Sequence, residues 1–422
     1  MGNNSPTVIE TSTNSPKLSL QCQSIGLNTT TIRSLDWERS RFDIEFGLRN
    51  GTTYNSFIIQ GEKTVLIDSS HVKFKEIWLK VLQEKIDPKA IDYLVVSHTE
   101  PDHSGLISDI LDLNNNIEIY GSKVAIQFLQ NQVHRPFRST AIKTGNELDL
   151  GKNSSNGIHH KLQFISAPNL HWPDTIFSFD HGTNILYTCD AFGLHYCTDE
   201  LFDLEPEVIS SDFRYYYDCL MGPNARSVLQ ALKRIKSLPD IKTIAVGHGP
   251  LLHHNIELWL NNYHEWSRQR NTTDGYAAIC YISQYGFCDR LSQAIALGAS
   301  KADAQVQLVD IRASDSQELS ALIGEAKAVI LPTWPSKADT ELQSAIGTLL
   351  AALKQKQWVG VYESFGKNDE PIDVIANQLR GLGQKEAFSP LRIKKSPDAN
   401  TFQQFEEAGT DLGQLLNRKK NI

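Results

Sequence analysis

Several hallmarks of common protein classes are missing from this chain of 422 residues. No apolar run approaches the roughly 20 residues that a membrane-spanning helix needs. No basic stretch followed by an apolar one marks a secretory signal near the N-terminus. The formal net charge is -8 at pH 7, so the chain lacks the basic excess that binds nucleic acids and anionic membranes. We therefore expect no membrane span and no nucleic-acid partner.

Two sequence motifs are also missing. The six cysteines are scattered, with no Cys-x-x-Cys pair and no dense framework, which excludes a disulfide scaffold. Such cysteine usage indicates a reduced compartment, so we expect a cytoplasmic protein. The glycine-rich dinucleotide fingerprint is absent, which leaves NAD binding within this chain unsupported.

Changes in composition divide the chain into three parts. Residues 1–32 are rich in Ser, Thr, Asn and Gln and are predicted to form a flexible polar tail. The second part is a domain predicted at residues 33–270. Short β-rich runs dominate it from about residue 40 to 252, and several end near His or Asp, which predicts one shared site. From residue 275 to 422 strands alternate with helices, which predicts a doubly wound parallel sheet of five strands. The candidate strands are Ala277–Ile282, Val306–Ile311, Ala328–Leu331, Trp358–Tyr362 and Pro390–Ile393.

The densest group of reactive side chains lies in the run Ser97–Gly105, directly after the apolar run Tyr93–Val96. It places two imidazoles and two carboxylates within six positions. Three more His or Asp residues follow later predicted strands. Two metal ions that share a bridging carboxylate need about three terminal ligands each, so seven candidates match a dimetal centre. The seven are His98, Glu100, Asp102, His103, His171, Asp190 and His248.

The order of these ligands resembles the metallo-β-lactamase fold over residues 33–260. The hydrolytic branch of that fold uses His-x-His-x-Asp-His and binds zinc, whereas Glu100 here replaces the second histidine. An anionic oxygen in place of a neutral nitrogen favours iron and its ferric state. His-x-Glu-x-Asp-His followed by His, Asp and His is the signature of flavodiiron proteins, and all seven positions are filled here. The resemblance implies an αββα sandwich followed by a flavodoxin-like domain.

The same resemblance distributes the seven side chains over two non-haem irons. One iron is expected at His98, Glu100 and His171, and the other at Asp102, His103 and His248, with Asp190 as the bridge. The remaining histidines lie outside the pattern and are expected to be structural or solvated. Trp172 and Tyr54 are candidates for the pocket wall or the core.

A second candidate site lies at the start of the C-terminal domain. The loop Ser283–Cys288 follows the first predicted strand there and precedes a helix, so its backbone N–H groups are placed to bind a phosphate. It looks like the phosphate loop of flavodoxins, with Cys288 in the usual Ser or Thr position, and implies FMN as cofactor. Two further loops are expected to flank the flavin, with Trp334 as the stacking ring. The candidate FMN residues are Ser283, Gln284, Tyr285, Gly286, Phe287, Cys288, Pro332, Thr333, Trp334, Pro335, Ser364, Phe365 and Gly366.

The likeness is greatest to the flavodiiron proteins of cyanobacteria and chloroplasts, on the segments Ser34–Trp37 and Asn50–Ser56. It implies an electron sink in which FMN feeds a diiron centre that reduces O2 to water, or NO to N2O. It also implies a head-to-tail homodimer or an oligomer with a paralogue. Most members of that group carry a third, flavin-reductase domain. Because this chain stops at Ile422, we expect either a truncated chain or electron supply by a ferredoxin or an NAD(P)H-linked reductase.

Two alternatives from other classes stay open. A zinc-dependent hydrolase of the same fold would cleave thioester, lactam or phosphodiester bonds and would hold no flavin. A catalytically silent subunit would bind flavin and regulate an active paralogue. Metal analysis with an absorption spectrum separates the hydrolase from the other two, and an oxygen-consumption assay exposes a silent subunit. The preference between O2 and NO stays open as well.

Overall fold

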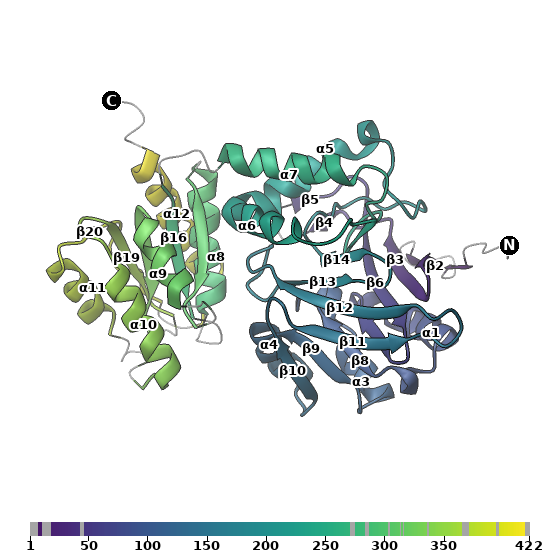
Figure 1. Ribbon diagram of the computed structural model, residues 1–422. Coiled ribbons are helices and arrows are strands. Elements are labelled where there is room, and N and C mark those ends of the chain that lie inside the picture. The colour runs from purple at the N-terminus through teal and green to yellow at the C-terminus, as the bar shows by residue number, and fades with distance from the viewer. Residues whose placement is uncertain are drawn as a thin grey trace. The chain divides into compact units, whose positions relative to one another are not determined.

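The computed structural model describes residues 7–10, 18–42, 46–270, 275–282, 287–302, 304–312, 314, 316–335, 337–364, 371–393 and 396–417 (Figure 1). The chain divides into two compact units between Trp266 and Ser267, with Pro223–Arg226 assigned to the second. This division falls in the last turn of helix α7 (Ile256–Arg270), a short way before the predicted boundary at residues 270–275. Among the described residues, no helix is long and apolar enough to cross a bilayer.

The first unit contains two β-sheets. The larger sheet has the order β1-β2-β3-β6-β7-β8-β9-β10 and changes from antiparallel to parallel pairing at β7. Its strands are β1 (Thr7–Glu10), β2 (Leu18–Gly26), β3 (Thr29–Asp36), β6 (Thr52–Gln60), β7 (Thr64–Ile67), β8 (Tyr93–Val96), β9 (Glu118–Ser122) and β10 (Arg138–Ile142). A separate hairpin consists of β4 (Arg41–Phe42) and β5 (Phe46–Gly47).

The smaller sheet has the order β11-β12-β13-β14-β15, antiparallel up to β14 and parallel between β14 and β15. Its strands are β11 (Glu147–Lys152), β12 (His159–Ser166), β13 (Ile176–Asp180), β14 (Ile185–Cys189) and β15 (Thr243–Val246). Strand β14 ends directly before the predicted metal ligand Asp190, and β15 ends two residues before the predicted ligand His248.

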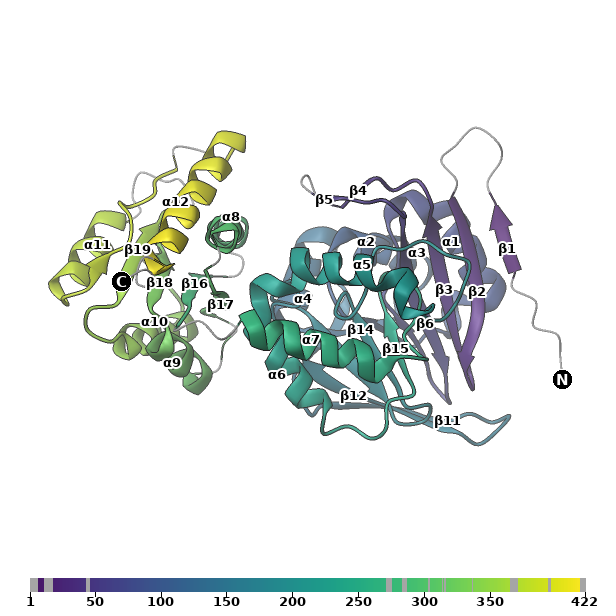
Figure 2. The ribbon, with the colours of Figure 1, turned by 90° about the horizontal axis from the view of Figure 1, so that it is seen from above.

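Helices cover the outer faces of both sheets (Figures 1 and 2). The alternation along β7 shows the layering, because Leu66 packs among the helices while Val65 and Ile67 belong to the core between the sheets. This arrangement confirms the predicted αββα sandwich. Over the larger sheet lie α1 (Lys75–Lys85), α3 (Ile107–Leu113) and α4 (Lys123–Val133), and over the smaller lie α5 (Pro206–Tyr216), α6 (Ala225–Ile235) and α7.

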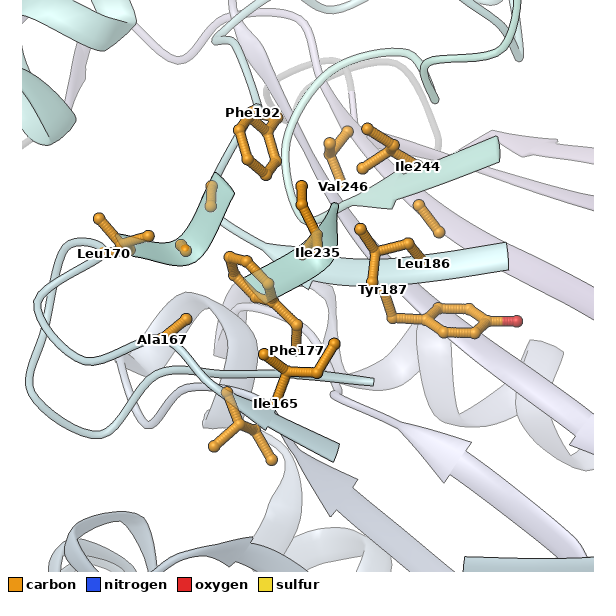
Figure 3. Close-up of a cluster of buried hydrophobic side chains, with 14 of the residues drawn as sticks. Ile165, Ala167, Leu170, Phe177, Leu186, Tyr187, Phe192, Ile235, Ile244 and Val246 are labelled. Atoms are coloured by element: carbon orange, nitrogen blue, oxygen red, sulfur yellow. The ribbon is translucent and has the colours of Figure 1, made fainter. Parts of the chain in front are cut away.

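The core around the smaller sheet holds the strand ends in place. Figure 3 shows Ile235 of α6 beside Phe177 and Leu186 of the sheet. The ring of Tyr187 points to the opposite face, where it meets Phe57 of the larger sheet at a centroid distance of 5.1 Å. Side chains on both faces of β14 are therefore buried, which fixes the position of the loop that follows it.

The predicted flexible tail is wrong for residues 18–32. Strand β2 pairs with β3 along its length, and β3 pairs with β6. Leu20 and Ile32 are buried against the helices of the outer layer. The apolar residues of β2 and β3 are separated by many Ser, Thr and Gln residues, several of which are themselves buried. The sequence therefore shows no clear alternation of apolar and polar residues there.

The second unit is a five-stranded parallel sheet of order β17-β16-β18-β19-β20, which is the flavodoxin order and confirms the predicted doubly wound sheet. Helices α8 and α12 lie on one face, and α9 and α10 lie on the other (Figure 2). The strands are β16 (Ala277–Tyr281), β17 (Val306–Asp310), β18 (Ala328–Pro332), β19 (Trp358–Tyr362) and β20 (Lys385–Glu386). The helices are α8 (Cys288–Lys301), α9 (Ser316–Glu325), α10 (Thr340–Ala352), α11 (Ile372–Gly381) and α12 (Ala399–Asn417).

The fifth strand begins earlier than predicted. The prediction placed it at Pro390–Ile393, whereas β20 is the exposed pair Lys385–Glu386, and only Leu391 makes a further bridge, to Tyr362. Proline at position 390 has no N–H group to donate, which explains the break in pairing. The charged residues of β20 gave no apolar signal.

Helices α8 and α12 approach each other closely through glycine. A Cβ atom at Gly298 would overlap the carbonyl oxygen of Glu406, and one at Gly409 would overlap that of Ile295. Helix α8 begins at Cys288, the last residue of the predicted phosphate loop. The close packing on α12 therefore also fixes the position of the helix that follows this loop.

Candidate metal centre

The seven predicted ligands converge at one edge of the sandwich, where strands of both sheets end. His98 and Glu100 follow β8, and the short helix α2 (Pro101–Ser104) carries the next two ligands. The other three come from loops of the smaller sheet. His171 lies between β12 and β13, Asp190 directly follows β14, and His248 follows β15.

Asp190 divides the four histidines into two pairs. Its Oδ2 lies 3.4 Å from Nε2 of His98 and 3.2 Å from Nε2 of His171, which form the first histidine pair. Its Oδ1 lies 2.9 Å from Nε2 of His103 and 3.1 Å from Nε2 of His248, which form the second histidine pair. One carboxylate oxygen therefore faces each pair, as a bridge between two ions requires.

Each histidine pair has a carboxylate of its own. Glu100 Oε2 lies 3.2 Å and 3.1 Å from the Nε2 atoms of the first pair. The two oxygens of Asp102 each lie 3.5 Å from one Nε2 atom of the second pair. The structure thus brings all seven residues together in the two groups that the resemblance implied.

The donor atoms fit two metal ions. Nε2 of His171, Nε2 of His248, Oδ1 of Asp102 and Oδ2 of Asp190 are buried and have no hydrogen-bond partner of proper geometry among the described residues. Buried polar atoms that approach one another without forming hydrogen bonds are typical of ligands directed at a common ion. With three carboxylates and four imidazoles, the donor set is harder than that of a thiolate site and suits iron.

The outer nitrogens of the ligands are anchored by their surroundings. His98 Nδ1 lies 2.9 Å from Asp174 Oδ1, and Asp174 Oδ2 accepts hydrogen bonds from the backbone N–H and hydroxyl of Thr99 at 2.7 Å and 2.5 Å. His248 Nδ1 donates to the backbone carbonyl of Thr53 at 2.7 Å. These contacts direct Nε2 of both rings toward the centre.

The charges of the site compensate each other. Burial opposes protonation of His103 and His171, but the carboxylates outweigh burial and raise their pKa values to about 9 and about 10. Burial likewise opposes ionisation of Asp190, yet the surrounding imidazoles hold its pKa well below the usual range. Metal ions would replace the protons that now neutralise these carboxylates.

A cavity of about 630 Å³, here called the mouth, opens onto the ligands Glu100 and Asp102. Asp36 on its wall is almost fully buried and accepts hydrogen bonds from Lys73 and, at 3.1 Å, from Tyr54. The remaining wall residues are Glu38, Arg39, Ser40, Arg41, Phe42, His71 and Pro101.

Two neighbours of the centre, Asp174 and His195, were not predicted to take part in it. Asp174 stands three residues after His171 in the sequence but gave no signal of its own. The ring of His195 packs 4.7 Å from that of His248, although the sequence offered no reason to separate it from the other histidines. Trp172 and Tyr54 had been named as candidates for the pocket wall or the core. Trp172 meets the ring of His98 edge-on at 4.9 Å, and Tyr54 is buried beside His248.

The described residues of the predicted FMN loops come together near the carboxyl ends of β16, β18 and β19. Ser364 links them, because its carbonyl accepts from Phe287 N at 2.7 Å and its N–H donates to Thr333 Oγ1 at 3.0 Å. The Cys288 thiol is buried and donates to Ser364 Oγ at 2.8 Å, so it ties loops together instead of facing a phosphate. Trp334 and Pro335 are half-buried, and Pro332 ends β18. Ser283, Gln284, Tyr285, Gly286, Phe365 and Gly366 lie outside the described residues.

Comparison with known proteins identifies the family. The model of the ODP family beta lactamase matches residues 52–249. Diflavin flavoprotein A 1 of Synechocystis sp. is 51% identical over 400 residues, which cover 95% of this chain and 69% of that protein. The chain belongs to the flavodiiron family. This flavodiiron protein is also similar to putative diflavin flavoprotein A 3 of Nostoc sp., at 51% identity over 96% of this chain and 70% of that protein.

Solved structures agree with the assignment. The metal-soaked flavodiiron core of Flv1 from Synechocystis sp. covers 95% of this flavodiiron protein and 99% of its own chain, with 33% identity and a TM-score of 0.76. Rubredoxin oxygen:oxidoreductase of Desulfovibrio gigas has the same fold at 24% identity and a TM-score of 0.56, over 95% of this chain and all of that chain.

Proposed function

We propose that this flavodiiron protein reduces O2 to water at a non-haem diiron centre that receives its electrons from FMN. The observation that carries the proposal is the position of Asp190 between two histidine pairs, each completed by a carboxylate. Glu100 stands where zinc hydrolases of this fold have histidine, which supports redox chemistry over hydrolysis.

Each group of side chains has a definite task in this reaction. His98, Glu100 and His171 would hold one iron, and Asp102, His103 and His248 the other, with Asp190 shared. Two irons held in this way would supply electrons to the substrate and stabilise the charge that develops on it. The protein keeps the ligand rings oriented through Asp174 and Thr53 and admits substrate through the mouth.

FMN would bind at the carboxyl ends of β16, β18 and β19, where ligands of doubly wound sheets bind. The backbone of the loop at residues 283–288 and the start of α8 would hold its phosphate, and Trp334 would stack on its ring. Thr333 and Ser364 support the site from behind, since both are fully buried and bonded to each other.

The proposal also covers the electron donor, the cellular location and the oligomeric state of the protein. Reduction of one O2 to two waters consumes four electrons and four protons, so a ferredoxin or an NAD(P)H-linked reductase must reduce the flavin repeatedly. We place the protein in the cytoplasm, as a head-to-tail homodimer or an oligomer with a paralogue, acting as an electron sink that protects against oxygen.

An electrode assay tests the function and separates the alternatives. The chain, loaded with iron and FMN and reduced chemically, is expected to consume O2 faster than NO, with water and not peroxide as product. Faster NO consumption with N2O formation would make it a nitric oxide reductase. Flavin without consumption of either gas would indicate a silent subunit. Zinc with thioester, lactam or phosphodiester cleavage and no flavin would indicate a hydrolase.

A further inference from the structure

A second cavity, of about 690 Å³, lies in the first unit and shares no wall residue with the mouth. We call it the rear cavity. Its outer wall spans the segment 47–50 and the exposed side of α5, which are joined by a hydrogen bond of 3.2 Å from Asn50 Nδ2 to Asp212 Oδ1. The residues that line it are Gly47, Leu48, Arg49, Asn50, His195, Tyr196, Val208, Ser211, Asp212, Tyr215 and Tyr216.

The inner end of the rear cavity reaches the metal centre from behind. Its floor is formed by His195 and Tyr216, which are 7% and 2% exposed and whose rings lie 4.9 Å apart. The ring of His195 lies 4.7 Å from the ring of the ligand His248, and that of Tyr216 lies 6.2 Å from it. One layer of side chains therefore separates this cavity from the second histidine pair.

Two polar atoms on this floor are buried without a partner. His195 uses Nδ1 for a contact of 2.8 Å with Thr52 Oγ1, while its Nε2 has no hydrogen-bond partner among the described residues. The hydroxyl of Tyr216 is also buried and has no hydrogen-bond partner among the described residues. Buried polar groups in proteins are almost always satisfied, and where protein atoms are missing the partner is an ordered water. A water between these two residues would satisfy both.

The mouth is bordered by predicted metal ligands and the rear cavity is not, so the rear cavity suits water better than substrate. The mouth is bordered by the ligands Glu100 and Asp102 themselves, so a molecule entering there meets the ligands directly. The rear cavity contains no predicted ligand, and the ring of Phe42 packs 4.3 Å from His195 on the side of the mouth. A molecule in the rear cavity thus meets hydrogen-bonding groups before it meets the metal ligands.

We propose that the rear cavity is a water channel whose inner station is a water held by His195 Nε2 and Tyr216 Oη. Its use rests on the proposed function: O2 enters at the mouth, and the water that the reaction releases leaves behind His248. The station does not depend on that function, because it rests on two buried, unpartnered atoms of residues that line the cavity.

A crystal structure of the iron- and FMN-loaded protein tests the station. We expect an ordered water within hydrogen-bonding distance, roughly 2.7–3.2 Å, of both His195 Nε2 and Tyr216 Oη. The Tyr216→Phe variant is expected to lose this water while the His195 ring keeps its place on Thr52. A dry gap, a protein group or an anion between the two residues would overturn the proposal.

A variant that blocks the rear cavity tests whether product water leaves through it. Ser211 is an exposed cavity residue on α5, and Ser211→Trp would fill the channel. Glu207→Trp is the matched control, since Glu207 is exposed on the same helix but does not line the cavity. Product release limits the turnover of many enzymes, so we expect kcat for O2 to fall by roughly threefold or more in Ser211→Trp, with kcat/KM unchanged. The control is expected to match the wild type.

The outcomes separate this proposal from the proposed function. A fall in kcat/KM in Ser211→Trp would show that the cavity admits gas, and unchanged kinetics would show that no traffic passes through it; both contradict the channel. If the wild type reduced no O2, the proposed function would fail, while the crystallographic water would still decide whether the station exists.

Discussion

The Nδ1–H group of His98 donates a hydrogen bond of 2.9 Å to Oδ1 of Asp174, and both side chains are fully buried. Asp174 comes from the loop before β13 in the smaller sheet, whereas His98 follows β8 in the larger one. The bond therefore joins the two halves of the sandwich at the metal centre. It also fixes which nitrogen of His98 faces the ligands.

We expect Asp174→Asn to lower the iron affinity of the centre by about 10- to 100-fold, because the amide orients and polarises the ring less well. Competition with a chelator, followed by metal analysis, measures the change. Asp149→Asn is the matched control, since Asp149 also pairs with a histidine, His159, at 2.6 Å but on the exposed surface. Equal iron affinity in both variants would contradict the role of Asp174.

Glu100→His tests the reason for iron selectivity. The change restores the His-x-His-x-Asp-His order of zinc hydrolases and replaces an anionic ligand with a neutral one. We expect the ratio of bound iron to bound zinc, after loading with equal amounts of both, to fall by roughly tenfold or more. Glu257→His on the exposed side of α7 controls for a new surface histidine. An unchanged ratio would mean that Glu100 does not set the selectivity.

Asp203 organises the segment after His248 and gives a pH-dependent contribution to stability. Its Oδ1 accepts from the backbone N–H groups of His253 and His254 at 2.7 Å and 2.8 Å, and its Oδ2 accepts from Trp259 at 3.1 Å. Burial alone would raise the pKa of Asp203, but these donors outweigh it and lower the pKa. The stabilisation is thus present above the unfolded pKa of about 3.9 and is lost as the pH falls through the lower folded value.

Asp203→Asn is accordingly expected to reduce the free energy of unfolding by about 2 kcal/mol at pH 7. The difference from the wild type should shrink below about pH 4, where the wild-type carboxylate also becomes neutral. Denaturant unfolding of the first unit at several pH values measures it. Asp240→Asn at an exposed position is the control. A constant difference down to acid pH would contradict the charge-based account.

Gly409→Ala tests the close packing of α12 on α8. The new methyl group would meet the backbone carbonyl of Ile295, which has no freedom to move away, so we expect a loss of at least about 3 kcal/mol in the second unit. Gly347→Ala is the matched control, because nothing lies within 4 Å of its new Cβ and alanine favours the helix by about 0.5–1 kcal/mol. Thermal unfolding measures both; equal melting temperatures would contradict the packing.

The candidate ligands, which the structure brings together, could be recognised in the sequence because spacing and residue type carry the information. His98, Glu100, Asp102 and His103 stand in one run, and Asp190 and His248 follow apolar strands within two residues. Asp174 and His195 could not be recognised, since their roles depend on contacts with residues 76 and 53 positions away in the chain. Position on the chain does not reveal which polar side chain a distant ligand will meet.

The same distinction applies to the fold. The αββα sandwich was implied by the resemblance that the ligand order carries, and the alternation of strands with helices predicted the doubly wound parallel sheet of the second unit. Strands β2 and β3 were missed because Thr31 and Gln21 are polar yet buried, and β20 because its two residues are charged and exposed. These segments form strands because they pair with a neighbouring strand, and their own composition does not indicate it.

The central claim is that two irons share Asp190, and Mössbauer spectroscopy of the protein loaded with iron-57 tests it most directly. We expect two irons per chain with the magnetic coupling of a bridged pair. In Asp190→Asn, where the histidines are intact, we expect this coupling to be lost or weakened. A single iron per chain, or two irons without coupling in the wild type, would contradict the account.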